Sequence, residues 1–300
     1  MTDHTAPIPV ILDTDIGDDI DDTWALLMIL GCPELDLRLI VTDFGNTPER
    51  TRLVAKILEH AGRTDIPIGT GVATSANALN QQSWIEGYDV SRYPGTIIED
   101  GVGAMVDWIG RAGTPPVLLT IGPIPNIGVA LERAPEIAER TRIVAMAGSV
   151  YVGYGDKPER DKECNVVNSP KEWQAAFRAP WEITFVPLDS CGMVKLEGDA
   201  YRRVAESEHP FARTVIANYK HWANRPSDEP EASSILFDTV AAHAAFDESV
   251  FEVSEIGIEV TDDGYTVPDE SGRPVRCVLG WRDYPRFEGK LIESLTHPPT

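Results

Sequence analysis

The chain has 300 residues, of which 42% are hydrophobic and 25% are charged, and its formal net charge is −22. This length and balance are typical of a globular protein with enough material for a sizeable core. A chain this acidic is repelled by phosphate backbones and by anionic membranes, so we expect neither a nucleic-acid polymer nor a membrane surface as its partner.

The start of the chain, MTDHTAPIP, has neither the basic nor the apolar region of a signal peptide. The longest apolar run, 24–30, is too short to span a bilayer. The cysteines lie far apart without CxxC spacing, so we expect no zinc site and no disulfide framework. They are Cys32, Cys164, Cys191 and Cys277. The expected compartment is a reducing cytoplasm.

Strand-like and helix-like runs alternate through the first 190 residues. Short apolar runs predict strands, and apolar residues at helical spacing predict helices. The expected strands are 9–13, 37–41, 115–121, 142–147 and 182–187. The expected helices are 21–30, 48–62, 101–112, 124–133 and 170–178. This alternation predicts an α/β fold with a Rossmann-like, open, mostly parallel central sheet and helices on both faces.

The last third of the chain has a different pattern, with helices close together before two further strands. The expected helices are 197–206, 209–223, 236–246 and 284–295, and the expected strands are 255–260 and 275–281. The polar segment 224–234 is either a mobile lid or a plain surface connection. No linker stands out, so we expect a single domain over residues 1–300.

The densest chemical signal is ILDTDIGDDIDDTWAL (11–26), where six aspartates fall within ten positions after the first expected strand. Ligands of open α/β sheets bind beyond the carboxyl ends of strands. Like charges this close raise one another's pKa unless a cation lies among them. With few Lys or Arg nearby, Ca²⁺ is the natural partner, because it takes six to eight oxygen ligands. Helix capping explains one or two of these aspartates but not six.

Two other aspartate motifs fit this run poorly. An EF-hand loop starting at Asp13 needs an oxygen ligand and then a glycine where this chain has Gly17 and Asp18. A DxD phosphohydrolase needs Thr or Val where Gly17 stands, and the chain has no clear phosphate-gripping Lys motif.

The same run resembles the aspartate signature DTDPGxDDAxAL of the inosine–uridine-preferring nucleoside hydrolases, with two extra residues and Ile16 in place of the usual proline. Four later segments also resemble motifs of that family and occur in the same order. They are VTDFGN (41–46), LLTIGPIPNIGVAL (118–131), ECN (163–165) and FDTVAA (237–242). The resemblance implies the nucleoside hydrolase fold and Ca²⁺-dependent cleavage of a small-molecule ribonucleoside into base and ribose. It also implies a homo-oligomer, either a dimer or a tetramer.

The resemblance further implies roles for single residues. The implied Ca²⁺ ligands are Asp15, Asp22, Asp238 and the backbone carbonyl of Ile121. The implied ribose-binding residues are Asp21, Asn46, Glu163 and Asn165. Asp15 would also take a proton from the metal-bound water, and Asp13 would orient the site. The chemistry is consistent, because a cation acidifies water, a carboxylate removes its proton, and the C1′–N bond breaks through an oxocarbenium-like sugar.

The group that protonates the departing base is missing from its usual places. Where many family members have His before the last aspartate, this chain has Phe237. Where they carry HGxDG, this chain has IEGYD, which puts Glu86 at the His position. The loop 153–162 also lacks the Asn that usually precedes EFN and holds the 5′-hydroxyl.

Two hypotheses follow for the base. In the first, activation has moved to Glu86, with a pKa raised by an apolar pocket, or to stacking by Trp222, Tyr219 or Phe237. In the second, the substrate is a modified nucleoside or another N-riboside. The simpler alternatives are a surface Glu86 and a core position for Trp222 and Tyr219. The alternative to a hydrolase is a ribose- or nucleoside-binding protein that has the same fold but no catalytic activity.

Three further side chains have weaker expectations. His243 should face away from Asp238, since five helical positions turn about 500°, and we expect it to be structural. His221 remains a candidate for the base pocket. Cys164 should alternate away from Glu163 and point into the core.

Overall fold

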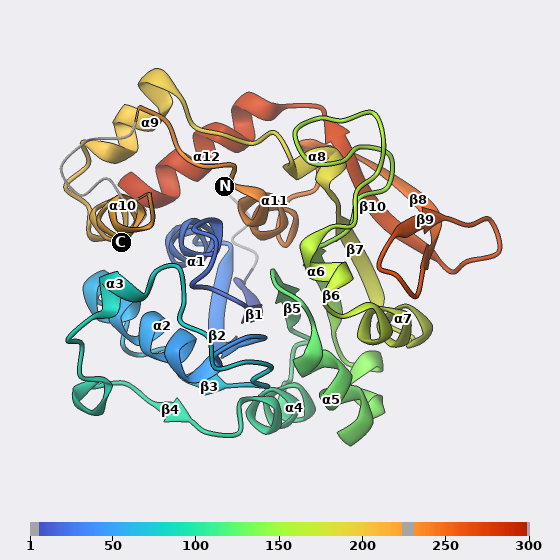
Figure 1. Cartoon of the computed structure of the whole chain (residues 1–300), viewed down its shortest axis with the longest axis horizontal. Helices are drawn as coiled ribbons and strands as arrows, with labels where there is room; N and C mark the ends of the chain where they lie inside the picture. The colour runs from blue at the N-terminus through green and yellow to red at the C-terminus, as the bar shows by residue number, and fades with distance from the viewer. Residues whose placement is uncertain (1–5, 224–230, 299–300) are drawn as a thin grey trace.

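A computed structural model of the chain, which describes residues 6–223 and 231–298, is built around a ten-stranded sheet (Figure 1). The strand order is β4-β3-β2-β1-β5-β6-β7-β10-β8-β9. All neighbours pair in parallel except β10 with β8 and β8 with β9. The strands are β1 (Ile8–Thr14), β2 (Leu35–Thr42), β3 (Ile68–Thr70), β4 (Ile97–Ile98), β5 (Val117–Thr120), β6 (Arg142–Met146), β7 (Glu182–Val186), β8 (Phe251–Val260), β9 (Thr266–Pro268) and β10 (Pro274–Trp281).

Helices connect the strands and cover both faces of the sheet (Figure 1). The α-helices are α1 (Asp21–Gly31), α2 (Thr47–Ala61), α3 (Gln82–Ile85), α4 (Gly101–Arg111), α5 (Pro125–Arg133), α6 (Cys164–Val167), α7 (Pro170–Arg178), α8 (Leu188–Cys191), α9 (Gly198–Ala205), α10 (Pro210–Trp222), α11 (Phe237–Ala244) and α12 (Tyr284–Thr296). Two 3₁₀-helices are η1 (Val90–Arg92) and η2 (Pro135–Glu139).

Alternate residues of the central strands face two separate hydrophobic cores. In β1, Val10 and Leu12 belong to one core and Ile11 belongs to the other. Helices α1, α2, α10, α11 and α12 pack in the first core, and α4, α5 and α7 pack in the second. A strand buried on both faces needs apolar residues at every position, which is why these strands read as continuous apolar runs.

The predicted mostly parallel sheet with helices on both faces is confirmed. Helix α7 has the predicted bounds, and β8 begins at Phe251 rather than at residue 255. Strands β3 and β4 were not predicted, because runs of three and two residues are too short to show a periodicity. Within the predicted loop 224–234, residues 224–230 lie outside the described part of the chain.

The strand order reverses at β1. From β1 the chain proceeds outward through β2, β3 and β4, and then returns to β5 on the other side of β1. Such a reversal opens a crevice at the carboxyl ends of the two central strands. The aspartate-rich loop 15–20 follows β1 and Ile121 follows β5, so both reach this crevice.

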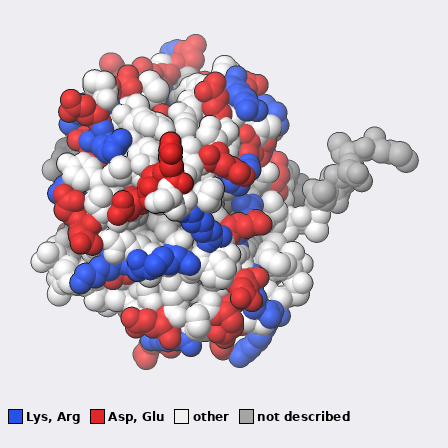
Figure 2. Space-filling model, turned by 90° about the vertical axis from the view of Figure 1, so that its right-hand side faces the viewer, with Lys and Arg blue, Asp and Glu red and all other residues white. Residues whose placement is uncertain are grey.

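The surface shows mixed charge. On the face drawn in Figure 2, Asp and Glu side chains are spread among the Lys and Arg side chains. Among the helices of residues 6–223 and 231–298, none has both the length and the apolar character that crossing a bilayer requires.

His243 on α11 is buried, with 1% of its surface exposed. Its ring lies 4.7, 5.7 and 5.3 Å from the ring centres of Phe246, Phe251 and Phe287. Burial lowers the pKa of His243 to about 4, and the nearby carboxylate of Asp247 opposes this shift only in part. This position agrees with the prediction that His243 is structural.

His243 should make the stability of the fold depend on pH. An unfolded His has a pKa near 6.5, so between that pH and about 4 only the unfolded chain gains the proton. The stabilisation is complete above pH about 6.5 and is lost as the pH falls towards 4. We predict that the unfolding free energy of the wild type, relative to that of His243→Phe, falls by up to about 3 kcal/mol as the pH is lowered over this range in urea titrations. A pH-independent difference would contradict this assignment.

Candidate active site

A cavity of about 350 Å³ opens at the crevice beside β1 and β5. Its acidic lining residues are Asp15, Asp18, Asp19, Asp21, Asp22, Glu163 and Asp238. Its other lining residues are Phe44, Asn80, Ile121, Met146, Tyr154, Cys164, Asn165, Trp222 and Phe237. Within the described part of the chain, no Lys, Arg or His lines it. The volume suits a small organic molecule, and the lining carries a large excess of negative charge.

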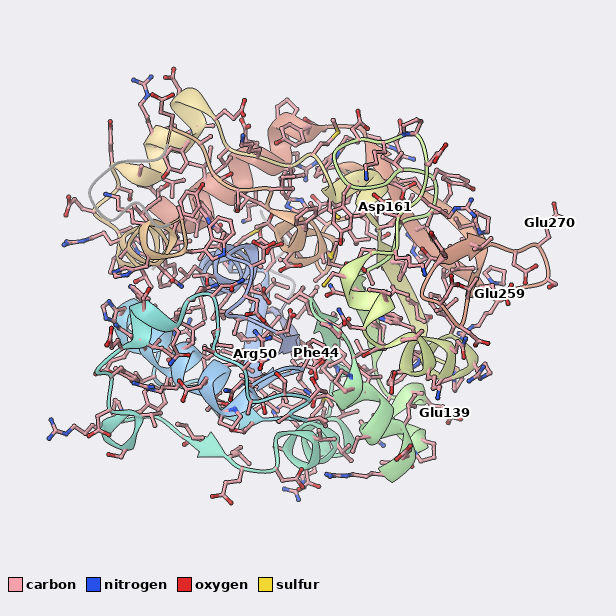
Figure 3. All side chains as sticks on the ribbon, viewed as in Figure 1. Phe44, Arg50, Glu139, Asp161, Glu259 and Glu270 are labelled. Carbon is pink, nitrogen blue, oxygen red and sulfur yellow. The ribbon has the colours of Figure 1, made fainter. Side chains whose placement is uncertain are left out.

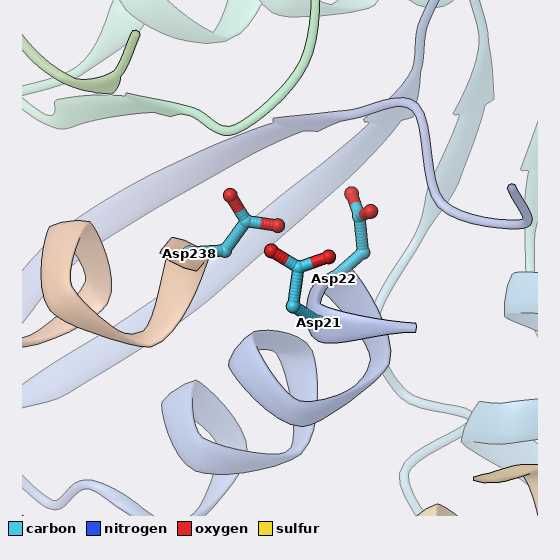
Figure 4. Close-up of side chains that lie close together, drawn as sticks. All are labelled: Asp21, Asp22 and Asp238. Atoms are coloured by element: carbon cyan, nitrogen blue, oxygen red, sulfur yellow. The ribbon is translucent and has the colours of Figure 1, made fainter. Parts of the chain in front are cut away.

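Three of the carboxylates form a cluster. Asp21 and Asp22 begin α1, Asp238 lies in the first turn of α11, and their side chains point toward one another (Figure 4). One oxygen from each lies within 4.8 Å of the others. The three residues are only 4%, 3% and 2% exposed. Burial is the largest cause of pKa values raised well above the usual range for all three, and the negative charge of neighbouring aspartates, Asp15 among them, is a further cause.

A hard divalent cation fits this cluster. Three carboxylates supply oxygen ligands of the kind that Ca²⁺ prefers, and the described part of the chain places no basic side chain in the cavity to neutralise them. Ile121, whose backbone carbonyl was the fourth implied ligand, lines the same cavity. The cluster differs from the set of Ca²⁺ ligands that the resemblance implies, because it contains Asp21, which was expected to bind ribose. Asp15 lines the cavity beside the cluster.

Asp15 is the first carboxylate after the end of β1. Burial raises its pKa to about 6, while the positive charge of Arg50 lowers it in part. The negative charge of Asp15 also raises the pKa of Asp21, Asp22 and Asp238. Asp15 therefore belongs to the same electrostatic unit as the cluster.

Buried polar side chains fix the end of β1 behind the cavity. The Thr14 hydroxyl donates to Asp22 Oδ1 at 2.5 Å and accepts from the Ile16 N–H at 3.1 Å. Asp13 is fully buried, and its Oδ1 accepts from Asn126 Nδ2 at 2.7 Å. Burial raises the pKa of Asp13 to about 7. Asp13 thus lies outside the cavity lining, in a position to orient the loop rather than to touch a ligand.

Glu163 and Asn165 reach the cavity from the start of α6. Glu163 Oε1 accepts from the Asn165 N–H, and Oε2 accepts from the Gly148 and Val166 N–H groups, at 2.8, 2.8 and 3.2 Å. Burial nevertheless raises the pKa of Glu163 to about 7. The prediction that Cys164 points into the core is wrong, because it is exposed and lines the cavity. Residues 164–167 form a helical turn, in which successive side chains do not alternate between two faces as they do in a strand.

Asn46 and Glu86, which were predicted to contact the substrate, do not line the cavity. The Asn46 side chain caps α2, where Oδ1 accepts from the Glu49 N–H at 3.4 Å, and Nδ2 donates to the Asn77 carbonyl at 3.1 Å. Glu86 is exposed at the end of α3 and is absent from the cavity lining. Arg52 of α2 binds the Ile85 carbonyl just before it, at 2.8 Å, and so holds this end of α3 against α2. The geometry gives no support to Glu86 as the acid.

Aromatic side chains line another part of the cavity. Trp222 Nε1 donates to the Asp18 carbonyl at 2.8 Å, which places the indole against the aspartate loop. Phe237 lies edge-on to Tyr154, with ring centres 6.1 Å apart. Tyr219 is buried and stacks on Trp222 at 5.9 Å, outside the lining. His221 is exposed and also lies outside the lining.

Arg50 is the functional residue that sequence reasoning missed. It is fully buried on α2, and its guanidinium donates to the carbonyls of Phe44 and Ile16 at 2.8 and 2.9 Å and to that of Asp15. Nη2 forms an ion pair with Asp18 at 2.7 Å. Figure 3 marks Arg50 and Phe44 near the middle of the molecule. Helical spacing puts Arg50 on the apolar face of α2 with Leu53 and Ile57. This pattern in the sequence could have predicted that Arg50 is buried and needs polar partners.

The fold and the carboxylate-lined crevice define an open α/β protein with a candidate metal centre at its topological switch point. The family model described as inosine-uridine preferring nucleoside hydrolase matches residues 10–288, and the chain belongs to this family.

Relatives agree with this assignment. The non-specific ribonucleoside hydrolase RihC of Salmonella typhi is 35% identical over 205 residues, which are 65% of this chain and 65% of that protein. The match therefore spans slightly less than two thirds of that relative's length. A plant nucleoside hydrolase, the PpNRh1 enzyme, aligns with a TM-score of 0.81 and 24% identity over 97% of this chain and 100% of that chain. A purine-preferring ribonucleoside hydrolase from Gardnerella vaginalis aligns with a TM-score of 0.76 and 23% identity, over 96% and 98% of the two chains. At such identities the structures show a shared fold.

Arg50 should contribute far more to stability than an exposed arginine. Arg50→Met removes the donor to the carbonyls of Phe44, Asp15 and Ile16 and the ion pair with Asp18, so we predict a loss of about 3 kcal/mol or more in the free energy of unfolding. The control is Arg111→Met, which removes an exposed ion pair with Asp107 on α4 and should cost less than about 1 kcal/mol. Urea unfolding measures both, and equal losses would refute the role given to Arg50.

Proposed function

We propose that this chain hydrolyses the N-glycosidic bond of a ribonucleoside, or of a related N-riboside, to free base and ribose in a Ca²⁺-dependent reaction. The observation that carries the proposal is the buried cluster of Asp21, Asp22 and Asp238 in a cavity without a described basic side chain. Membership of the nucleoside hydrolase family supports the reaction class.

The residues that would hold the cation are Asp15, Asp22, Asp238 and, through its carbonyl oxygen, Ile121. Asp21 would contribute negative charge beside them, since one of its oxygens lies within 4.8 Å of those of Asp22 and Asp238. When bound, Ca²⁺ would acidify water and hold two adjacent hydroxyls. Thr14 keeps the Asp22 carboxylate in place through its 2.5 Å hydrogen bond.

The ribose is proposed to bind through Asp21, Glu163 and Asn165, which all line the cavity. Glu163 Oε2 already accepts from two backbone N–H groups, whereas Oε1 accepts from one and keeps a lone pair for a sugar hydroxyl. Holding the hydroxyls from several sides fixes C1′ relative to the attacking water, and such positioning lowers the barrier by several kcal/mol.

Bond cleavage is proposed to use the carboxylates in two ways. The C1′–N bond breaks and its electron pair goes to the base nitrogen, while the water oxygen bonds to C1′ and Asp15 takes the water proton. Positive charge develops on the sugar during this step, and the negative charge of Asp15, Asp21 and Glu163 stabilises it. Trp222 and Phe237 offer aromatic faces to the base.

A second candidate function is a riboside-binding protein without catalysis. The observation that favours it is Phe237, which occupies the place where many family members have His, in a cavity without a described His, Lys or Arg. Turnover of any N-riboside decides between the two functions.

The proposed function predicts that ribose is released from at least one member of a panel of purine, pyrimidine and modified nucleosides, and that a Ca²⁺ chelator stops the release. Reducing-sugar assays with and without chelator measure both effects, and restored release after adding Ca²⁺ controls for damage. Release that continues in the chelator would remove the cation from the mechanism. No release from any riboside would favour the binding protein.

Asp15→Asn should abolish hydrolysis without unfolding the protein. The amide keeps the shape of the side chain but cannot take a proton, so we predict that kcat for p-nitrophenyl riboside falls by about a thousandfold. The melting temperature should stay within a few degrees of the wild type. Asp107→Asn, at an exposed position on α4, is the control. Turnover near the wild-type rate in Asp15→Asn would exclude Asp15 as the base.

A further inference from the structure

Among the described residues, no His, Lys or Arg lines the cavity to protonate a departing purine or pyrimidine, and Glu86 lies outside it. The aromatic lining residues are Phe44, Tyr154, Trp222 and Phe237. A neutral base leaves as an anion unless it is protonated, and the loss of a general acid costs such a reaction about 10²- to 10⁴-fold.

Tyr154 does not fill this role. Its hydroxyl oxygen accepts a hydrogen bond from the Cys164 N–H at 3.0 Å. Burial, and then the charge of Glu163, raise the pKa of Tyr154 above its usual value. Its hydroxyl is therefore a weaker acid than an ordinary tyrosine.

The lengthened aspartate loop adds negative charge to the same cavity. Asp18 and Asp19 both line it, and Asp18 is paired with Arg50 at 2.7 Å. Asp19 has no basic partner among the described residues, and its Oδ1 accepts only from the Ile20 N–H at 3.0 Å. The Trp222 ring, held to the Asp18 carbonyl, lies against this loop. Asp19, which is exposed, and Trp222 thus line the same cavity.

We propose that the preferred substrate is an N-riboside whose base is a cationic aromatic ring, of the N-ribosylpyridinium class. This rests on the proposed hydrolase function and names its substrate class. Aromatic faces attract cations, and the Trp222, Tyr154 and Phe237 rings supply them while Asp19 supplies the opposite charge. Uncharged bases gain less from either feature.

The chemistry of this class matches what the cavity lacks. When the C1′–N bond of an N-ribosylpyridinium breaks, its electron pair neutralises the ring nitrogen and the base leaves uncharged. Water adds its oxygen to C1′, and its proton goes to Asp15. No proton has to reach the base, so a cavity with no His, Lys or Arg among its described lining residues is sufficient.

The first test compares kcat/KM for three substrates of the Ca²⁺-loaded protein. N-ribosylnicotinamide has a cationic base, inosine needs protonation of its base, and p-nitrophenyl riboside is neutral and needs no acid. We predict that N-ribosylnicotinamide exceeds inosine by at least about a hundredfold. If inosine equals it, the substrate class is wrong and the hydrolase function stands. If no riboside is cleaved, the hydrolase function itself fails.

The second test is Asp19→Asn, with Asp107→Asn as the matched exposed control. Loss of the charge should lower the kcat/KM ratio of N-ribosylnicotinamide to p-nitrophenyl riboside roughly fivefold. p-Nitrophenyl riboside turnover also reports that the site is folded. If Asp19 were instead the acid for a neutral base, inosine would lose most of its rate and N-ribosylnicotinamide would not. That pattern, or an unchanged ratio, would overturn the proposal.

Discussion

Buried negative charge at the end of β1 is the constraint on which the site depends. Asp21, Asp22 and Asp238 are at most 4% exposed, and burial together with neighbouring carboxylates raises the pKa of each. An ionised carboxylate buried without a partner costs several kcal/mol. The fold must therefore either keep these groups protonated or recruit a cation to them. Binding a cation would lower the energy of the folded chain directly, which couples the stability of the protein to its chemistry.

The sheet topology gathers this charge, and polar contacts outside the cluster hold it. The strand reversal beside β1 leaves room for a ligand, and α11 brings Asp238 from far along the chain to α1. Arg50 binds the loop carbonyls and Asp18, so its positive charge fixes the loop without filling the cluster. Asn126 holds the Asp13 side chain behind the cavity by donating a hydrogen bond to its carboxylate. Rigidity is thus supplied by groups that do not compete with a cation for the carboxylates.

The sequence predicts the parallel sheet because doubly buried strands must be apolar throughout. The resemblance to the nucleoside hydrolases also predicts that the aspartates after β1 lie close to Asp238, and the fold brings Asp21 and Asp22 together with Asp238. The sequence does not predict where single side chains turn outside regular elements. The Asn46 side chain caps a helix, Cys164 begins one, and Glu86 follows a short helix held against α2. These outcomes depend on tertiary contacts that no local pattern records. Arg50 was detectable, since a charge on the apolar face of α2 requires a buried partner.

Isothermal titration calorimetry of the metal-free protein with Ca²⁺ measures cation binding at the buried carboxylates directly. We predict one ion per chain for the wild type. We predict loss of binding in Asp238→Asn, which removes one ligand charge from the cluster, whereas the exposed Asp107→Asn variant should still bind. Absence of Ca²⁺ binding by the folded wild type, or equal binding by Asp238→Asn, would contradict a cation at the buried carboxylates.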